Sequence, residues 1–255
     1  RLMSRVSREV FDAARANGIA LLYVTPSVNS YPIFTKKWGY VEAFENHFLV
    51  RPLKPSAMLS TIVRPRVIGW LAGLPVDLAL EAARHLVPPP AKYELQTVES
   101  FGSETDALWE RCRGNGIALV RDSTYLNWRY IHNPDQYFPF HIHRKGCGHL
   151  GILVLKHTMR RGCKVGEIVD FVCRGDDAET RQAILRLGIE RLRNDGCAFV
   201  QTWSIKGSSL EGDFKRSGFV IRRKKTPVLL SPGADTAQFY DKERWFLTQG
   251  DGNDL

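Results

Sequence analysis

The densest group of side chains that could do chemistry lies in residues 121–134. Asp122 or Ser123 can cap a short helix, and that helix would carry Tyr125, Trp128 and Arg129 within about one turn. Aromatic rings stack on planar groups, and a guanidinium binds carboxylates and phosphates through two parallel hydrogen bonds. The segment therefore favours a site for a polar, planar or phosphorylated ligand. The other interpretation, which stays open, is that the aromatic residues of this helix only fix it to a sheet.

Histidines and cysteines do not predict a metal site. His141 and His143 alternate with apolar residues on a predicted half-exposed strand, but no third ligand follows at a suitable spacing. The five cysteines stand singly, without a C-x-x-C pair. Scattered, odd-numbered cysteines favour a reducing compartment over a disulfide framework. We therefore expect a cytoplasmic protein.

The elements that must position such side chains begin in residues 1–53. Apolar residues at a spacing of three to four predict an amphipathic helix that ends at Asn17-Gly18. The apolar run 19–24 predicts a strand covered on both faces. A short helix is expected over residues 30–38, and Gly39-Tyr40-Val41 leads into another strand.

The same order of elements returns in residues 178–230. A predicted helix ends at Asp195-Gly196, a strand follows over 198–203, and a short helix spans 207–216. Gly18 and Gly39 are 21 positions apart, and Gly196 and Gly218 are 22 apart. Near-equal spacing of matching elements indicates a duplicated unit.

These residues carry a family resemblance. The unit resembles the C-terminal half of a GNAT-type N-acetyltransferase domain, with a helix ending in Ala-Asn-Gly, an Asn at 29 that opens the next helix, and a Lys-Trp-Gly-Tyr exit at 37–40. The segment 125–130, followed by Pro134, and the stretch from Trp245 onward are similar to tandem GNAT-like proteins of bacterial polysaccharide and envelope gene sets. The resemblance implies an α+β fold of tandem GNAT-like mixed sheets flanked by helices. Its first copy would be present only as the C-terminal half, because the chain looks N-terminally truncated.

The resemblance also implies a coenzyme A site in the first copy. In that family a Gly-rich loop and a helix N-terminus receive the pyrophosphate. Most of this loop would precede residue 1, which leaves Ser4 and Arg5 as phosphate neighbours and Asn29 beside the pantetheine arm. The family's general-acid tyrosine falls at Thr35, so Tyr31, one turn earlier, is the remaining catalytic candidate. An ordinary helical turn, an N-cap and a packed aromatic residue are the alternatives for these positions.

The matching loop of the second copy, residues 174–180, departs from the family pattern. It has one glycine and the carboxylates of Asp176, Asp177 and Glu179. Acidic side chains stabilise a helix N-terminus but repel a pyrophosphate. Phe214 also replaces the expected tyrosine. We expect this copy not to bind coenzyme A in the usual way and to serve as an acceptor-binding or scaffolding half.

Consecutive prolines at 88–90 mark a boundary between domains. We expect a first GNAT-like domain over 1–53, a linker with an apolar helix over 54–90, and a second GNAT-like domain over 91–255. Residues 67–80 are apolar but shorter than the ~20 residues that a membrane span requires. Packing between the domains is the favoured interpretation of this helix. Basic residues on both sides would also suit contact with an anionic membrane surface.

A net charge of +9 and a pI near 9.4 favour an anionic partner. The GNAT resemblance implies acyl transfer from acetyl-CoA, or another acyl-CoA, to an amine or hydroxyl of a sugar or envelope precursor, with a small molecule or glycan as acceptor. No DNA partner is expected, and residues 1–255 alone are expected to be inactive. Two alternatives stay open: a Fem-like transferase that takes its acyl group from aminoacyl-tRNA, and a catalytically dead GNAT-like binding module.

Overall fold

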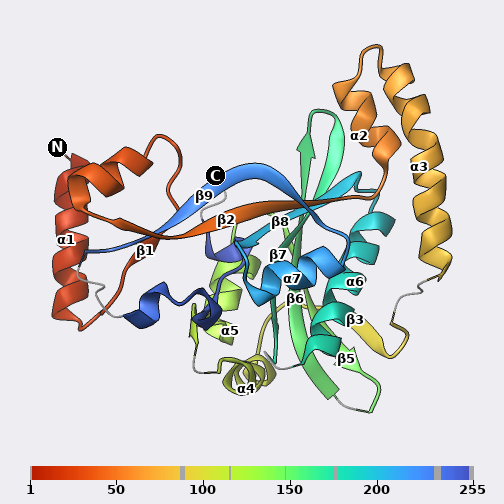
Figure 1. The fold of residues 1–255 in the computed structure, drawn as a ribbon. Helices are drawn as coiled ribbons and strands as arrows, with labels where there is room; N and C mark the ends of the chain where they lie inside the picture. Colours follow the sequence, from red (N-terminus) through yellow and green to blue (C-terminus); the bar gives the residue numbers. More distant parts are fainter. Residues whose placement is uncertain are drawn as a thin grey trace.

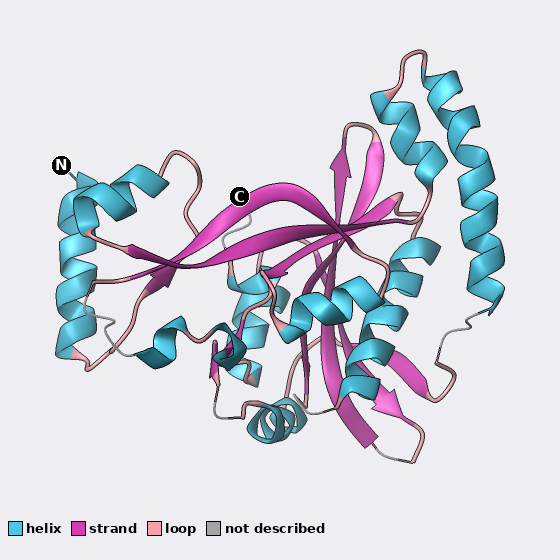
Figure 2. Ribbon diagram, in the orientation of Figure 1, coloured by secondary structure: helices cyan, strands magenta, loops and turns pink. Residues whose placement is uncertain are grey.

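One mixed sheet of eight strands runs through the molecule in the order β1-β9-β2-β8-β7-β6-β5-β3, with helices on both faces (Figures 1 and 2). The computed structural model describes residues 2–86, 90–114, 116–146, 148–174, 177–232 and 237–252. For residues 2–7, 15, 62, 83–86 and 223–225 it describes only the backbone. The predicted α+β class is confirmed.

The elements have the following bounds. The strands are β1 (Tyr23–Val24), β2 (Val41–Pro52), β3 (Tyr93–Thr97), β4 (Ile117–Ala118), β5 (Tyr137–Arg144), β6 (Gly148–Arg160), β7 (Cys163–Cys173), β8 (Phe199–Ile205), β9 (Val220–Leu230) and β10 (Trp245–Phe246). The α-helices are α1 (Leu2–Ala16), α2 (Pro55–Ile62), α3 (Arg66–Leu86), α4 (Ser103–Cys112), α5 (Ser123–Leu126), α6 (Ala178–Asn194) and α7 (Ser209–Arg216). Short π or 3-10 turns are η1 (Ile33–Lys37), η2 (Asn127–Ile131), η3 (Ala237–Tyr240), η4 (Lys242–Arg244) and η5 (Gln249–Asp251).

The order of elements predicted to recur does recur, as α1-β1-η1-β2 and again as α6-β8-α7-β9. The last strand of each unit pairs with the first strand of the other. β2 lies antiparallel to β8, β9 lies antiparallel to β1, and β2 and β9 pair with each other. The strands of residues 1–53 therefore belong to the same continuous sheet as those of residues 91–255, where we had expected two sheets.

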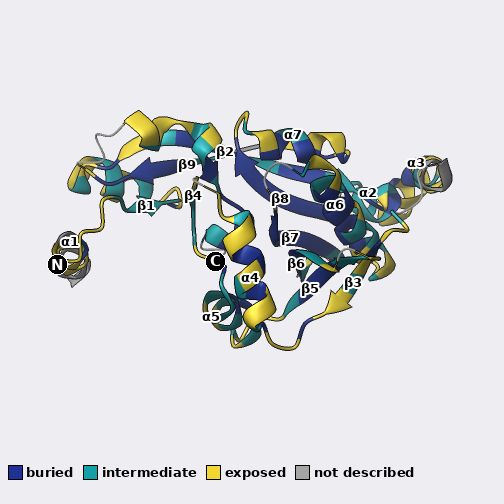
Figure 3. Ribbon diagram, turned by 90° about the horizontal axis from the view of Figure 1, so that it is seen from below, coloured by how far each residue is buried: buried dark blue, intermediate teal, exposed yellow. Residues whose placement is uncertain are grey.

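The two faces of the sheet carry separate cores because side chains alternate along each strand. Leu153, Leu155 and Ile168 face α6 and α7, whereas Ile152 and Val154 face α4 and α5. Strands β7 and β8 are buried along nearly their whole length and are dark blue in Figure 3, whereas the edge strand β3 is largely exposed. This two-sided burial explains the nearly continuous apolar sequence of β7.

Two predicted strands differ from the structure. The run 19–24 forms a strand only at Tyr23–Val24, and Ile19 is 50% exposed, because β9 pairs with just these two residues. His141 on β5 is buried and not half-exposed. Its Nε2 lies 3.4 Å from the hydroxyl of Thr105, because α4 covers that face of the strand. Among the described residues, no group of three His, Cys, Asp or Glu residues could hold a metal ion.

The linker prediction is wrong in one respect. Residues 55–86 form an antiparallel pair of helices, α2 and α3, and α3 does not pack between two domains (Figure 1). Val67, Leu71 and Leu78 of α3 are all exposed to solvent. None of the described helices combines the length and the apolar content that a bilayer span needs.

Candidate functional site

The sheet opens between β7 and β8, the only parallel neighbours among its described strands. These strands pair over Val165–Glu167 and Phe199–Gln201, and beyond that point each continues without the other. Both strands are followed by helices, α6 and α7. In open α/β sheets the crevice outside the carboxyl ends of neighbouring strands is the usual ligand-binding position.

The C-terminal segment occupies the opening between these strands. The amide of Gln249 donates to Oε2 of Glu167 on β7 (2.7 Å), and Gln201 on β8 donates to Oε1 of the same carboxylate (2.8 Å). The fit at Gly250 is close, because a Cβ there would lie 2.1 Å from the Tyr130 hydroxyl. The segment thus fills the opening and is joined to the parting strands through side-chain hydrogen bonds.

A buried arginine holds this segment in place. Arg121 is fully buried, and its Nε donates to both oxygens of Asp170 at 3.0 Å. Its Nη2 donates to Asp251 (2.6 Å) and to the hydroxyl of Thr248 (3.1 Å). Burial opposes the charge of Arg121, but Asp170 and Asp251 together raise its pKa above the usual range. We call Arg121, Asp170, Thr248 and Asp251 the C-terminal clasp.

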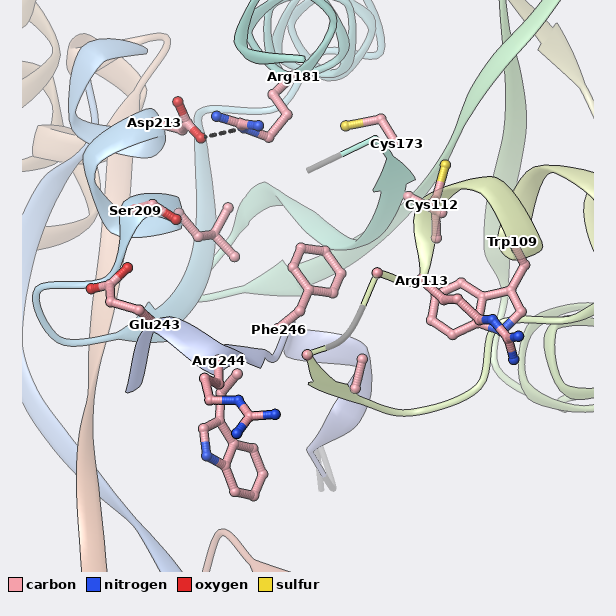
Figure 4. Close-up of a pocket in the computed structure, with 16 residues that line it drawn as sticks. Trp109, Cys112, Arg113, Cys173, Arg181, Ser209, Asp213, Glu243, Arg244 and Phe246 are labelled. Atoms are coloured by element: carbon pink, nitrogen blue, oxygen red, sulfur yellow. Dashed lines mark hydrogen bonds and ion pairs between the residues drawn. The ribbon is translucent and has the colours of Figure 1, made fainter. Parts of the chain in front are cut away.

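A pocket of about 260 Å³ opens next to the clasp (Figure 4). It lies beyond the end of β7, between the end of α4, the first turns of α6 and α7, and β10. Its apolar wall consists of Trp109, Cys112, Val172, Leu210, Trp245 and Phe246. The ring of Phe246 also lies 5.1 Å from the Arg121 guanidinium, so the pocket and the clasp share a wall.

The polar rim of the pocket carries both signs of charge. Arg113, Arg181 and Arg244 contribute three cations, and Asp213 and Glu243 contribute two anions. Nε of Arg181 is 2.8 Å from Oδ2 of the buried Asp213, an ion pair visible in Figure 4. The pocket therefore suits a compact amphipathic group better than a strongly anionic one.

The start of α6 does not offer a free anion site. Asp177 caps this helix, since its carboxylate accepts hydrogen bonds from the Thr180 backbone N–H (2.8 Å) and hydroxyl (2.6 Å). A carboxylate in that place occupies the amides and the positive end of the helix dipole that an external phosphate would use. Asp176 lies outside the described residues.

Cysteine chemistry is not favoured at this pocket. Burial raises the pKa of the Cys173 thiol well above its ordinary value. A thiol, unlike a thiolate, is a poor nucleophile. Cys173 is therefore part of the wall and not a reactive group at neutral pH.

Two solved structures share this architecture. A GCN5-related N-acetyltransferase from Anabaena variabilis is 12% identical, with a TM-score of 0.55 over 87% of this chain and 48% of that chain. The chain has the GNAT fold. A probable N-acyltransferase from Enterococcus faecalis is 15% identical, with a TM-score of 0.53 over 89% of this chain and 49% of that chain. The chain thus spans about half the length of these structures. No protein-family model matches the sequence, and no curated protein matches it.

Within this GNAT fold the predicted ligand-binding helix lies beside the C-terminal segment. Of the two predicted caps, Asp122 and Ser123, it is Asp122 that caps the helix, with its carboxylate 2.8 Å from the Tyr125 backbone N–H. Arg129 donates to the carbonyl oxygens of Gly250 and Gly252, both at 3.0 Å. Burial, with Asp251 second, raises the pKa of Tyr125 to about 12. Tyr125 and Arg129 therefore meet the chain's own C-terminal segment.

The other large side chains of this helix divide between the two interpretations, a ligand site and packing against the sheet. Trp128 is 63% exposed, and its ring lies 5.8 Å from that of Tyr125, so it does not pin the helix to the sheet. Leu126 and Tyr130 are buried and do pin it. The Tyr130 hydroxyl donates to Asp170 at 2.9 Å, which links the helix to the C-terminal clasp.

The predicted first-copy residues lie on α1 and around the turn that leads into η1. Asn29 is exposed in the turn before η1, where Ser27 and not Asn29 accepts the hydrogen bonds of the following residues. Tyr31 donates to Glu42 at 2.6 Å, and this bond raises its pKa. Ser4 and Arg5 lie in α1, but their side chains are outside the described residues.

Sequence reasoning missed Tyr23, which lies where the two units meet. Its hydroxyl donates to the carbonyl oxygen of Asp251 at 3.4 Å, and burial raises its pKa well above the usual value. Gly252 lies between Thr25 and Trp203, which belong to the first and second units. The available signal was a phenol inside an otherwise apolar run.

Proposed function

We propose that the intact protein is an acyl-CoA-dependent acyltransferase, with acetyl-CoA as the simplest donor and an amine or hydroxyl of a sugar or envelope precursor as acceptor. The observation that carries the proposal is the GNAT fold, in which the unit α1-β1-η1-β2 recurs as α6-β8-α7-β9. The two solved structures with this fold are described as an N-acetyltransferase and a probable N-acyltransferase. Transfer forms a bond from the acceptor nitrogen or oxygen to the acyl carbon and breaks the thioester bond, while the acceptor's proton leaves to a base.

The second unit does not fit the coenzyme. Gln249 and Gly250 fill the opening between β7 and β8, and Asp177 occupies the start of α6. A pantetheine arm would have to displace a segment held by the buried Arg121. We therefore assign no step of the reaction to a cofactor in this unit.

The division of roles between the units follows from this misfit. The first unit, with Ser4, Arg5 and Asn29, is proposed to contact the coenzyme, and Tyr31 remains the proposed acid for its leaving thiolate. The pocket in Figure 4, together with Tyr125, Trp128 and Arg129, is proposed to contact the acceptor. Aromatic rings and a fixed guanidinium suit a sugar or a phosphate-bearing precursor.

A thermal-shift titration of the intact protein and three variants tests this assignment. A ligand that binds the native state raises the free energy of unfolding, and with it Tm. At a ligand concentration a hundredfold above Kd the added free energy is about 2.7 kcal/mol. Coenzyme A and acetyl-CoA should raise the Tm of the wild type, and Asn29→Ala should lose the shift. Ser209→Trp, which narrows the pocket from the exposed first turn of α7, should keep it, as should Ser209→Ala.

Two results would contradict the proposal. No shift of the wild type at millimolar coenzyme A would remove the acyl-CoA assignment. A shift lost in Ser209→Trp but kept in Asn29→Ala would place the coenzyme in the second unit.

A non-catalytic binding module is the second candidate, and the filled opening between β7 and β8 favours it. Such a module would bind a glycan without turning it over. Isothermal titration with envelope glycans, followed by mass spectrometry of the glycan after incubation with acetyl-CoA, separates the two. Added acyl mass supports transfer, and binding without added mass supports the module.

A further inference from the structure

The helix pair α2–α3 lies at one end of the molecule, beside the β6–β7 hairpin (Figure 1). One face of α3 is fixed against α2 at close range. A Cβ on Gly69 would lie 2.5 Å from the Leu59 carbonyl oxygen, and one on Gly73 would lie 2.3 Å from Cα of Ser56. Asp77 completes this face, since its carboxylate accepts from the Ser56 backbone N–H at 3.0 Å.

The opposite face of α3 is apolar and exposed. Val67, Leu71, Leu74 and Leu78 follow one line at the helical spacing, and the first, second and fourth are 63%, 53% and 71% exposed. Trp70, 47% exposed, lies at the side of this line. The line is about 17 Å long at 1.5 Å per residue. The four positions of the line carry no charge themselves; Asp77 lies on the side toward α2, and Glu81 pairs with Arg193 of α6 at 3.6 Å. Soluble monomers rarely leave so continuous an apolar patch exposed.

Basic residues lie where α3 begins and on the β6–β7 hairpin beside α2. Arg64 and Arg66 are exposed where α3 begins. The β6–β7 hairpin lies beside α2, because the Cys163 thiol contacts the Ala57 carbonyl oxygen at 3.2 Å, and its turn presents the exposed Arg160 and Arg161. The partner of this surface must therefore accept an apolar stripe and bring negative charge.

We propose that α3 lies in the plane of an anionic membrane surface, with Val67, Leu71, Leu74 and Leu78 among the acyl chains. An amphipathic helix binds in this way when its apolar face enters the boundary between headgroups and acyl chains and basic residues meet anionic lipids. Trp70 at the side of the stripe suits the interface, where tryptophan is enriched. A second copy of this chain is a poorer partner, because it would bring the same arginines together. The proposal is independent of acyl transfer.

Sedimentation with lipid vesicles tests the proposal on the full chain. At about 50 mM salt the wild type should bind vesicles of phosphatidylcholine with 30% phosphatidylglycerol and should not bind pure phosphatidylcholine. The double variant Leu71→Glu/Leu78→Glu should bind roughly tenfold more weakly or worse, because two carboxylates would enter the boundary region. Val28→Glu/Val220→Glu adds the same charge at two exposed apolar positions outside the α2–α3 helix pair and should keep most of the binding. Arg64→Gln should weaken binding about fivefold.

Three results would overturn it. The first is a wild type that stays in the supernatant with anionic vesicles. The second is a Leu71/Leu78 variant that binds no more weakly than the Val28/Val220 variant. The third is a wild-type dimer, measured by sedimentation equilibrium, that the Leu71/Leu78 variant converts to a monomer without any vesicle binding. Circular dichroism of each variant confirms that it is folded before the comparison is made.

Discussion

At the scale of single residues, the C-terminal clasp is the main group of buried charges described. Arg121 is the largest fully buried side chain described, and its two carboxylate partners, Asp170 and Asp251, lie 49 and 130 positions away in the sequence. Burial raises the pKa of Asp251, and Arg121 opposes this. Substitution of one charged residue of the clasp would therefore leave its partner buried and unpaired.

Replacing Arg121 by Met should lower the free energy of unfolding by about 3–5 kcal/mol, because Asp170 and Asp251 would keep their burial without a cation. Urea denaturation followed by circular dichroism measures the change. Arg113→Met is the matched control: Arg113 pairs with Glu110 at 2.9 Å, both are more than half exposed, and its loss should cost less than about 1 kcal/mol. Equal effects of the two substitutions would show that the clasp does not hold the C-terminal segment.

His141 should make the protein less stable in mild acid. Burial, with His149 second, lowers the pKa of His141 to about 4, whereas an unfolded histidine has a pKa of about 6.5. Between these values the unfolded chain binds the extra proton, so stability is unaffected above pH 6.5 and falls as the pH drops toward 4, by at most about 1.4 kcal/mol per pH unit. Urea midpoints at pH 7.5, 6 and 5 should show a shallower fall for His141→Gln than for the wild type. His132→Gln, at the end of η2, should keep the wild-type slope.

At the scale of elements, the α2–α3 pair depends on two glycines. Gly73→Ala would normally favour a helix by about 1 kcal/mol, but here the added methyl group would meet the Ser56 backbone. Overpacking of this kind costs about 1–3 kcal/mol, so the two helices should move apart. Hydrogen exchange of the α2 and α3 amides should become faster.

Gly212→Ala in α7 provides the control for this prediction. A Cβ there would meet only the side-chain end of Arg216, at an ordinary 3.5 Å. This variant should be as stable as the wild type or more stable by up to about 1 kcal/mol. If Gly73→Ala behaved in the same way, the close crossing of α2 and α3 would be wrong.

At the scale of the whole molecule, the pairing of β2 with β8 and of β9 with β1 makes the two units depend on each other. Leu49 of β2 is fully buried in the core formed with α6 and α7, although it belongs to residues 1–53. Leu49→Ala should lower the free energy of unfolding by about 2–5 kcal/mol. It should also accelerate hydrogen exchange in β7 and β8 as much as in β2 itself. Val41→Ala, on an exposed position of the same strand, should cost less than about 0.5 kcal/mol. A variant in which residues 1–53 unfold while the amides of β7 and β8 stay protected would contradict the pairing of β2 and β9 with strands of the other unit.

Much of the fold followed from the sequence alone, because helix and strand patterns are local. The repeated order of elements, the cap at Asp122 and the acidic start of α6 at Asp177 are all set by residues within a few positions of each other. The α+β class follows from these elements. The residues that could serve a ligand on α5 and η2, Tyr125 and Arg129, could likewise be recognised from their types and spacing.

Only the tertiary structure decided which strands pair and what fills the opening between β7 and β8. Backbone hydrogen bonds are the same for every strand, so nothing in the sequence of β2 shows that it pairs with β8 across the other unit. Arg121, Tyr23 and Asp251 could not be connected from the sequence, because their contacts join positions that are far apart along the chain. The exposed stripe of α3 was also decided there, since an apolar helix pattern is the same whether its partner is another helix or lies outside the molecule.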